Sequence, residues 1–120
     1  MGAFTATATD AVRRLKTDDE TMSWKAFSRG IAGKKTSGEK FSYAYAVMAY
    51  MLSKNASGVK RSDTPRQIEK KLADRDDIGP VSEMTDSYEK ISYAGLAQPE
   101  EKTGRLTAHI SGFLKKMMGE

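Results

Sequence analysis

The sequence predicts an all-α protein, a small bundle of four to five helices. Apolar residues recur at steps of three and four in several separate stretches, as they do along one face of a helix. No stretch alternates apolar and polar residues as a half-buried strand does. Residues 40–54 are apolar around most of the helical circumference, which is typical of a helix surrounded by others. Because 120 residues suit one domain, we assign residues 10–118 to a single helical domain, and we expect residues 1–9 to be a disordered lead or residues left from cloning.

The N-terminal part of the chain is expected to start with a short basic helix. Asp10 can cap it, and Val12 and Leu15 form its apolar side. Its exposed residues are Arg13, Arg14 and Lys16. Residues 1–60 hold ten Lys or Arg against five Asp or Glu, whereas residues 61–120 hold ten against eleven. This bias can attract nucleic acid or an anionic membrane surface, and an ordinary solvated face has the same composition.

A second helix is expected after the acidic break at residues 17–20. We expect it to fray at Gly30 and Gly33, and residues 34–38 to form a loop. Its apolar face consists of Met22, Trp24, Phe27 and Ile31.

The stretch 40–54 is expected to be the central helix. Its fifteen residues are too few, and too rich in Tyr and Ser, to span a bilayer. We expect it to end near Asn55, with Gly58 as the left-handed closing residue. One apolar face comprises Phe41, Ala44, Tyr45, Met48, Met51 and Leu52, and a second stripe comprises Tyr43, Val47 and Tyr50.

A capping signal opens the helix expected over residues 65–73. Thr64 can be the N-cap, and Pro65 occupies the first helical position. Gln67 stands where a capping box needs Glu or Gln. The residues facing the core are Ile68 and Leu72.

Two further helices complete the expected bundle. Residues 75–80 break the chain, residues 81–93 form a helix, and Gly95 closes it. Residues 98–101 open the last helix with a proline and two carboxylates, which suit the positive end of the helix dipole. The buried stripe of the first consists of Val81, Met84, Tyr88 and Ile91, and that of the second of Leu106, Ile110, Phe113, Leu114 and Met117.

The composition excludes several kinds of chemistry. The chain has no cysteine, which excludes disulfides, thiolate catalysis and cysteine zinc sites. Its single histidine, His109, excludes the usual multi-histidine metal clusters. No apolar run is long enough for a signal peptide or a membrane span, so the isolated chain is expected to be soluble.

The remaining candidates for chemistry have structural explanations. His109 has no acid or nucleophile at a fixed local spacing, so we expect a structural histidine. The acidic residues 18–20 and 76–77 are expected to cap helices and aid solubility rather than to act as acid–base pairs. Gly30 and Gly33 lack the sequence context of a phosphate-binding loop. Five aromatic residues are spaced like core residues, and as a stacking box for a ligand they would have to be exposed: Trp24, Phe27, Tyr43, Tyr45 and Tyr50.

A helix-turn-helix DNA reader around Gly79-Pro80 is excluded by charge and geometry. The connection at residues 75–80 is longer than the usual three or four residues. The helix that would enter the groove carries three carboxylates against one lysine: Glu83, Asp86, Glu89 and Lys90. Phosphates repel such a helix.

Three motifs give residues 41–95 a resemblance to a known family. The aromatic helix AYAVMAYMLSKNASG is followed by SDTPRQIEKKL and then by SEMTDSYEKISYAG. This order resembles the uncharacterised C-terminal helical domain of bacterial and archaeal transglutaminase-like membrane proteins, in which Thr-Pro-Arg-Glu starts a helix and Tyr-Glu leads into Tyr-Gly. The matching residues are Thr64, Pro65, Arg66, Tyr88 and Glu89. The chain departs from the pattern at Gln67, which stands in place of Glu, and at Ala94, which separates Tyr93 from Gly95.

The resemblance implies a location more than an activity. Such a domain lies on the cytoplasmic side of the membrane as part of a larger membrane protein, and the transglutaminase-like part lies on the other side. The catalytic cysteine of that part is not in this chain. The basic residues Arg13, Arg14 and Lys16 would then lie near an anionic membrane surface, in agreement with the positive-inside rule.

We therefore expect a non-catalytic cytosolic helical module that acts through a protein partner in interaction or regulation. The alternative is a free-standing basic helical protein that binds nucleic acid nonspecifically. A small enzyme would need a pocket with clustered, perturbed acids, which the sequence does not show. No catalytic, metal-binding or cofactor-binding residue is assigned, and neither a cofactor nor a small-molecule substrate is expected.

Overall fold

The computed structural model describes residues 23–54 and 57–118. Within these ranges the chain is helical and contains no strand, which confirms the all-α prediction. The helices are α2 (Trp24–Ala32), α3 (Ser37–Ser53), α4 (Pro65–Lys71), α5 (Val81–Ser92) and α6 (Glu100–Met117). The expected lead, the basic helix after Asp10, the acidic break at residues 17–20 and Met22 lie outside the described residues.

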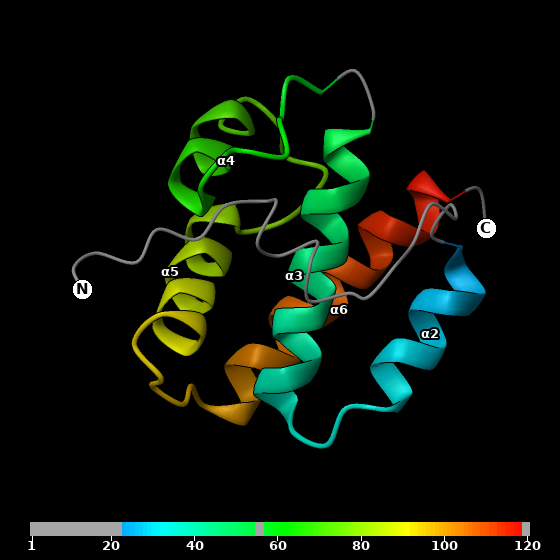
Figure 1. The fold of residues 1–120 in the computed structure, drawn as a ribbon, viewed down its shortest axis with the longest axis vertical. Coiled ribbons are helices and arrows are strands. Elements are labelled where there is room, and N and C mark those ends of the chain that lie inside the picture. The colour runs from blue at the N-terminus through cyan, green and yellow to red at the C-terminus, as the bar shows by residue number, and fades with distance from the viewer. Residues whose placement is uncertain (1–22, 55–56, 119–120) are drawn as a thin grey trace.

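Helix α3 is the centre of the bundle. It packs most extensively against α6, which crosses behind it in Figure 1, while α2 and α5 flank it on opposite sides and α4 packs on α5. Three neighbours cover so much of α3 that it must be apolar nearly all round, as its sequence predicted. Its buried residues are Phe41, Ala44, Tyr45, Ala46, Val47, Met48, Ala49, Tyr50 and Leu52.

Helix α3 begins three residues before the expected start, inside the predicted loop at residues 34–38. Thr36 is the N-cap, and its hydroxyl accepts a hydrogen bond from the backbone N–H of Glu39 at 3.1 Å. The Glu39 carboxylate accepts from the backbone N–H of Thr36 at 3.2 Å, which completes a capping box. Two donor groups that a helix end leaves free are thereby satisfied, so Ser37 and Gly38 are helical and the loop prediction was wrong there.

The expected fraying of α2 at Gly30 is also wrong, because α2 continues to Ala32 and ends with Gly33 as its C-cap. The reason for the glycine is packing. A Cβ atom at Gly30 would lie 2.1 Å from the Tyr43 hydroxyl oxygen and 2.2 Å from the ring carbon that bears it. The ring of Tyr43 therefore rests on the bare backbone of α2 and stacks on Phe27, with ring centroids 5.8 Å apart.

The sequence motifs of α4 and α5 form one connected unit. Thr64 and Gln67 make the predicted capping box, with Pro65 at the start of α4. Arg66 Nη2 donates to Glu89 Oε1 at 2.8 Å and so ties the first turn of α4 to α5. One residue before Glu89, Tyr88 stacks on Tyr45 of α3 at a centroid distance of 4.3 Å. The Thr-Pro-Arg and Tyr-Glu motifs therefore join α4, α5 and α3 to one another.

Two connections contribute to the core beyond what their polar sequences predicted. Val59 and Ile78 are buried. Asp63 is also buried, at 5% exposure, and its carboxylate accepts from Lys71 Nζ at 2.6 Å. Helix α3 itself ends at Ser53 with Lys54 as its C-cap, so Gly58, whose φ is +87°, serves the connection beyond the helix rather than its last turn.

The predicted ends of the last two helices agree with the structure. Gly95 has φ +66°, and the next backbone N–H donates to the carbonyl of Lys90 at 2.8 Å. Helix α6 starts directly after Pro99, and the hydroxyl groups of Ser37 and Thr103, 2.7 Å apart, link the first turns of α3 and α6.

Candidate functional site

A groove with a volume of about 510 Å³ runs beside the first half of α3, between the α2–α3 loop and α5. It is continuous with a second depression of about 410 Å³, because both are lined by Glu39 and Ile91. We call the two together the α3 groove. The first part is lined by Gly33, Lys34, Lys35, Glu39, Ser42, Tyr43, Ala46, Tyr88 and Ile91, and the second also by Thr36, Ser37, Gly38, Gly95, Leu96, Ala97, Gln98 and Glu100.

The floor of the α3 groove combines small and aromatic residues. Ala46 leaves room above α3, and Tyr43 and Tyr88 border it from either side. Tyr43 is half-buried and burial raises the pKa of its hydroxyl, so the phenol stays protonated at neutral pH. The Ser42 hydroxyl oxygen is buried and makes no hydrogen bond within the described residues. The floor is therefore apolar, with one hydroxyl group whose hydrogen-bonding capacity is unused.

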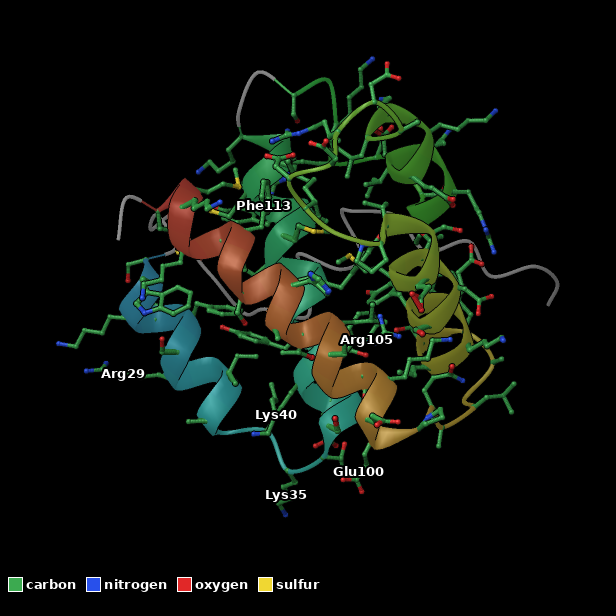
Figure 2. The ribbon with its side chains drawn as sticks, turned by 180° about the vertical axis from the view of Figure 1, so that it is seen from behind. Arg29, Lys35, Lys40, Glu100, Arg105 and Phe113 are labelled. Carbon is green, nitrogen blue, oxygen red and sulfur yellow. The ribbon has the colours of Figure 1, made fainter. Side chains whose placement is uncertain are left out.

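The rim of the α3 groove is basic. Lys34 Nζ lies 5.0 Å from the centroid of the Tyr43 ring, a cation–π distance. Lys35 is exposed, and its side chain extends away from the body in Figure 2. The loop that carries them is held by Lys40, whose Nζ donates to the carbonyls of Ile31 and Lys34 at 3.0 Å each.

The one carboxylate on the wall of the first part of the groove is already engaged. Glu39 accepts hydrogen bonds from the backbone N–H groups of Lys35 and Thr36, and these bonds hold the pKa of its carboxyl below the ordinary value. Its charge stabilises the start of α3 and only partly offsets the two lysines. The rim of the first part therefore keeps a net positive charge, whereas Glu100 adds a carboxylate to the second part.

Charge is distributed unevenly over the two halves of the described chain. Several cations of the second half form ion pairs, among them Arg66–Glu89, Lys71–Asp63 and Arg105–Glu83, although others, such as Lys70 and Lys116, form none within the described residues. Within residues 23–54 and 57–118, by contrast, no ion pair involves the cations of α2 or of the α2–α3 loop. We call these four residues the basic side: Lys25, Arg29, Lys34 and Lys35. Arg29 and Lys35 both extend into solvent in Figure 2.

The acids of α5, which argued against a DNA-reading helix, all have partners. Glu83 pairs with Arg105 at 3.0 Å, and hydrogen bonding to that arginine holds the pKa of the Glu83 carboxyl below its ordinary value. Asp86 pairs with Lys90 at 3.0 Å, and Glu89 pairs with Arg66. These carboxylates stabilise the bundle, which is a structural role.

The other residues considered from the sequence are not brought together. His109 is exposed on α6 beside Gly79 and does not line the α3 groove. Asp77 pairs with Arg75 at 2.7 Å. Tyr45, Tyr50 and Phe27 are buried in the core, whereas Trp24 and Tyr43 are partly exposed. Of the aromatic residues considered as a stacking box and expected in the core, Tyr43 alone lines the first part of the α3 groove.

The described residues contain neither a cluster of metal ligands nor a membrane-spanning helix. No three His, Asp or Glu side chains in residues 23–54 and 57–118 are grouped as a metal ion requires. In the same ranges, every helix is too short or too polar to cross a membrane. No protein-family model, curated protein or solved structure matches the chain.

Proposed function

We propose that the chain is a non-catalytic helical module, the cytosolic part of a membrane-anchored transglutaminase-like protein, whose basic side faces anionic lipid headgroups. The observation that carries the proposal is the basic side itself: four cations, close together in the sequence, that make no ion pair within the described residues and have Glu39 as a nearby carboxylate. The resemblance at Thr64-Pro65-Arg66 and Tyr88-Glu89 supports the membrane setting.

The size of the charge effect is appropriate for reversible membrane contact. A Lys or Arg near an anionic leaflet contributes about 1 kcal/mol, so the four cations of the basic side contribute about 4 kcal/mol together. That corresponds to weak binding, in the millimolar range. It suits a module that a membrane anchor already holds close to the lipid, because the anchor raises the local concentration.

A non-catalytic role is supported by where the acids and the histidine lie. The carboxylates of α5 form ion pairs with neighbouring basic residues, and His109 makes no ion pair within the described residues. General acid–base chemistry needs such groups to converge on one cavity.

Co-sedimentation with lipid vesicles tests the lipid contact. We expect the full chain to bind vesicles that contain phosphatidylserine and not vesicles of phosphatidylcholine alone, and to dissociate as salt is raised. The double substitution Lys25→Gln/Arg29→Gln should weaken binding by about thirtyfold, since it removes two of the contributing charges at about 1 kcal/mol each. The matched control Lys60→Gln/Lys70→Gln removes two exposed charges near α4 and should leave binding unchanged. Equal binding to both kinds of vesicle would refute the proposal.

A free-standing nucleic-acid binder is the second candidate, because unpaired cations would attract phosphates as well as lipid headgroups. Its binding must fall steeply with salt, and the basic-side variant must weaken it. The structure offers little for base stacking, since Phe27, Tyr45 and Tyr50 are buried and Lys115 Nζ lies 5.9 Å from the centroid of the Trp24 ring. A band shift with single-stranded RNA at low salt, together with no vesicle binding, would favour this candidate over the first.

A further inference from the structure

We infer that the end of the bundle where α2 begins and α6 ends lies in the headgroup layer of the membrane, with Trp24 as its aromatic anchor. We call this part the tryptophan end: Trp24, Lys25 and Lys115. The inference rests on the proposed lipid contact and deepens it, because it gives the module an orientation on the lipid and adds a cation from α6. Three observations carry it: a surface without acids, a lysine–tryptophan contact and an indole N–H that makes no hydrogen bond within the described residues.

The tryptophan end joins two stretches that are far apart in the sequence. The start of α2 and the end of α6 lie side by side in both views of the molecule (Figure 1 and Figure 2). They are in contact, because Lys115 Nζ lies 5.9 Å from the centroid of the Trp24 ring. Residues 23–38 and residues 102–118 each hold four Lys or Arg and no Asp or Glu. The two stretches therefore bring positive charge together, and neither of them brings a carboxylate.

Lys115 belongs to this surface, whereas its neighbour Lys116 lies on another side of α6. Both are exposed, and neither makes an ion pair within the described residues. The pKa of the Asp77 carboxyl is held below its ordinary value mainly by the hydrogen bond from Arg75, and the charge of Lys116 lowers it further. Successive residues point about 100° apart around a helix, so Lys116 lies on the side of Asp77 while Lys115 lies over Trp24. The tryptophan end thus has a matched lysine next to it that is not part of it.

The ring surface of Trp24 is engaged within the protein. Trp24 is partly buried against the core, with its ring centroid 5.4 Å from that of Phe27. The Lys115 ammonium group lies over the same ring system. A nucleobase would need free ring surface for stacking, whereas a headgroup layer offers hydrogen-bond acceptors and needs no free ring face. These contacts therefore favour lipid over single-stranded nucleic acid at this end.

The indole N–H of Trp24 is left for an acceptor outside the bundle. It reaches the surface and makes no hydrogen bond within residues 23–54 and 57–118. Tryptophan is enriched at membrane interfaces because its ring is apolar and its N–H is polar, so one end is dry and the other is wet. Phosphate and ester oxygens of the lipid would accept from this N–H, and Lys25 and Lys115 would meet the phosphate charge.

Tryptophan fluorescence tests the inference directly, because Trp24 is the single tryptophan of the chain. The full chain is titrated with vesicles that contain phosphatidylserine and, separately, with vesicles of phosphatidylcholine alone. We expect the emission to move to shorter wavelength only with the anionic vesicles, since the indole passes from water into the headgroup layer. Lipid brominated near the headgroup end of its acyl chains should then quench the emission more strongly than lipid brominated near the chain ends.

Three variants locate the contact. Lys115→Gln should weaken binding to anionic vesicles about fivefold, because it removes one contributing charge. The matched control Lys116→Gln, from the same helical turn, should leave the affinity within about twofold of that of the unchanged chain. Trp24→Phe keeps an aromatic ring beside Phe27 and removes the N–H, so it should weaken binding about threefold. Circular dichroism establishes that each variant is folded.

The outcomes separate the inference from the lipid proposal on which it rests. Co-sedimentation with anionic vesicles without any change in Trp24 emission would overturn the inference and leave the lipid proposal standing. Equal weakening by Lys115→Gln and Lys116→Gln would also overturn it, since the attraction would then be a diffuse effect of charge. Absence of co-sedimentation refutes the lipid proposal and the inference together, and quenching of Trp24 by single-stranded RNA in that case would favour the nucleic-acid candidate.

Discussion

Replacing Gly30 by alanine should destabilise the bundle, although the same change in most helices is stabilising. Alanine is favoured over glycine in a helix interior by about 1 kcal/mol. Here the new Cβ would lie 2.1 Å from the Tyr43 hydroxyl oxygen and 2.5 Å from a ring carbon, so the ring must move. Overpacking of this kind costs about 1–3 kcal/mol, and moving the ring also disturbs its stack on Phe27. The net expectation is a loss of about 1 kcal/mol in the free energy of unfolding.

A matched control separates the clash from the helix propensity. Gly112 lies inside α6, is exposed, and has no atom within 4 Å of the position of a Cβ. Gly112→Ala should therefore stabilise the protein by about 0.5–1 kcal/mol. The two substitutions are chemically identical, so the difference between them, about 2 kcal/mol, measures the cost of moving Tyr43.

Urea unfolding followed by circular dichroism gives both values, and a double-mutant cycle sharpens them. In a Tyr43→Ala background the obstacle is gone, so Gly30→Ala should change sign and stabilise by about 0.5–1 kcal/mol. If Gly30→Ala stabilises the unchanged chain as much as Gly112→Ala does, the proposed packing of Tyr43 on the backbone of α2 is wrong.

Three further substitutions probe other parts of the fold. Thr36→Ala should lower the free energy of unfolding by about 1 kcal/mol, since it removes the side-chain cap of α3. Thr36→Ser keeps a hydroxyl group and should retain most of the stability. Equal urea midpoints for these two variants and the unchanged chain would contradict the role of the cap. Burial raises the pKa of the Asp63 carboxyl, but hydrogen bonds from Lys71 and the backbone of Lys60 outweigh it, so the folded pKa lies below the ordinary value. The stability that this carboxylate contributes is complete above pH ~4 and is lost as the pH falls through its folded pKa. Asp63→Asn should therefore be less stable than the unchanged chain at neutral pH and should lose less of its stability between about pH 5 and pH 2. Parallel curves of melting temperature against pH for the two chains would exclude the effect. Gly79 has φ +115°, so Gly79→Ala should lower the free energy of unfolding by about 1–3 kcal/mol. Adding His109→Ala should not restore this stability, because the strain lies in the backbone rather than in the contact with the histidine ring. Full rescue in thermal melts would show instead that the contact with the ring causes the loss.

Much of the fold follows from local sequence signals. The start of α4 is recognisable without any tertiary information. It consists of the N-cap Thr64, the helix-starting Pro65 and the capping-box residue Gln67. The apolar pattern of α3 identified most of its buried residues, since a helix with no polar face must be surrounded, although Tyr43 and Met51 are only partly buried. In both cases the local sequence alone is enough to predict the structure.

The two wrong predictions, the loop at Gly38 and the frayed helix end at Gly30, both came from reading a glycine as a break in a helix. Gly38 suggested a loop, although Thr36 and Glu39 around it carry the spacing of a capping box. Gly30 suggested a frayed end, although its purpose is to admit the ring of Tyr43 from another helix. Local sequence shows that a glycine is tolerated and does not show whether a turn or a neighbouring side chain requires it.

The α3 groove could not be predicted from the sequence for a similar reason. It exists because α2 and α5 flank α3 without closing over Ser42 and Ala46, and that depends on how three helices are placed. The positive character of the N-terminal half was visible in the composition. The structure adds that the described cations of α2 and the following loop make no ion pair within the described residues, whereas several of those in the second half do.

The central position of α3 has a consequence for synthesis on the ribosome. Its principal partner, α6, ends 64 residues after α3 ends. At a synthesis rate of about 5–20 residues per second, roughly 3–13 s pass between the completion of α3 and the completion of α6. During that interval a helix that is apolar nearly all round has only α2 and then α5 to shield it. A nascent chain halted before Glu100 should therefore be a substrate for chaperones that recognise apolar segments, and it should become resistant to protease only when α6 has emerged.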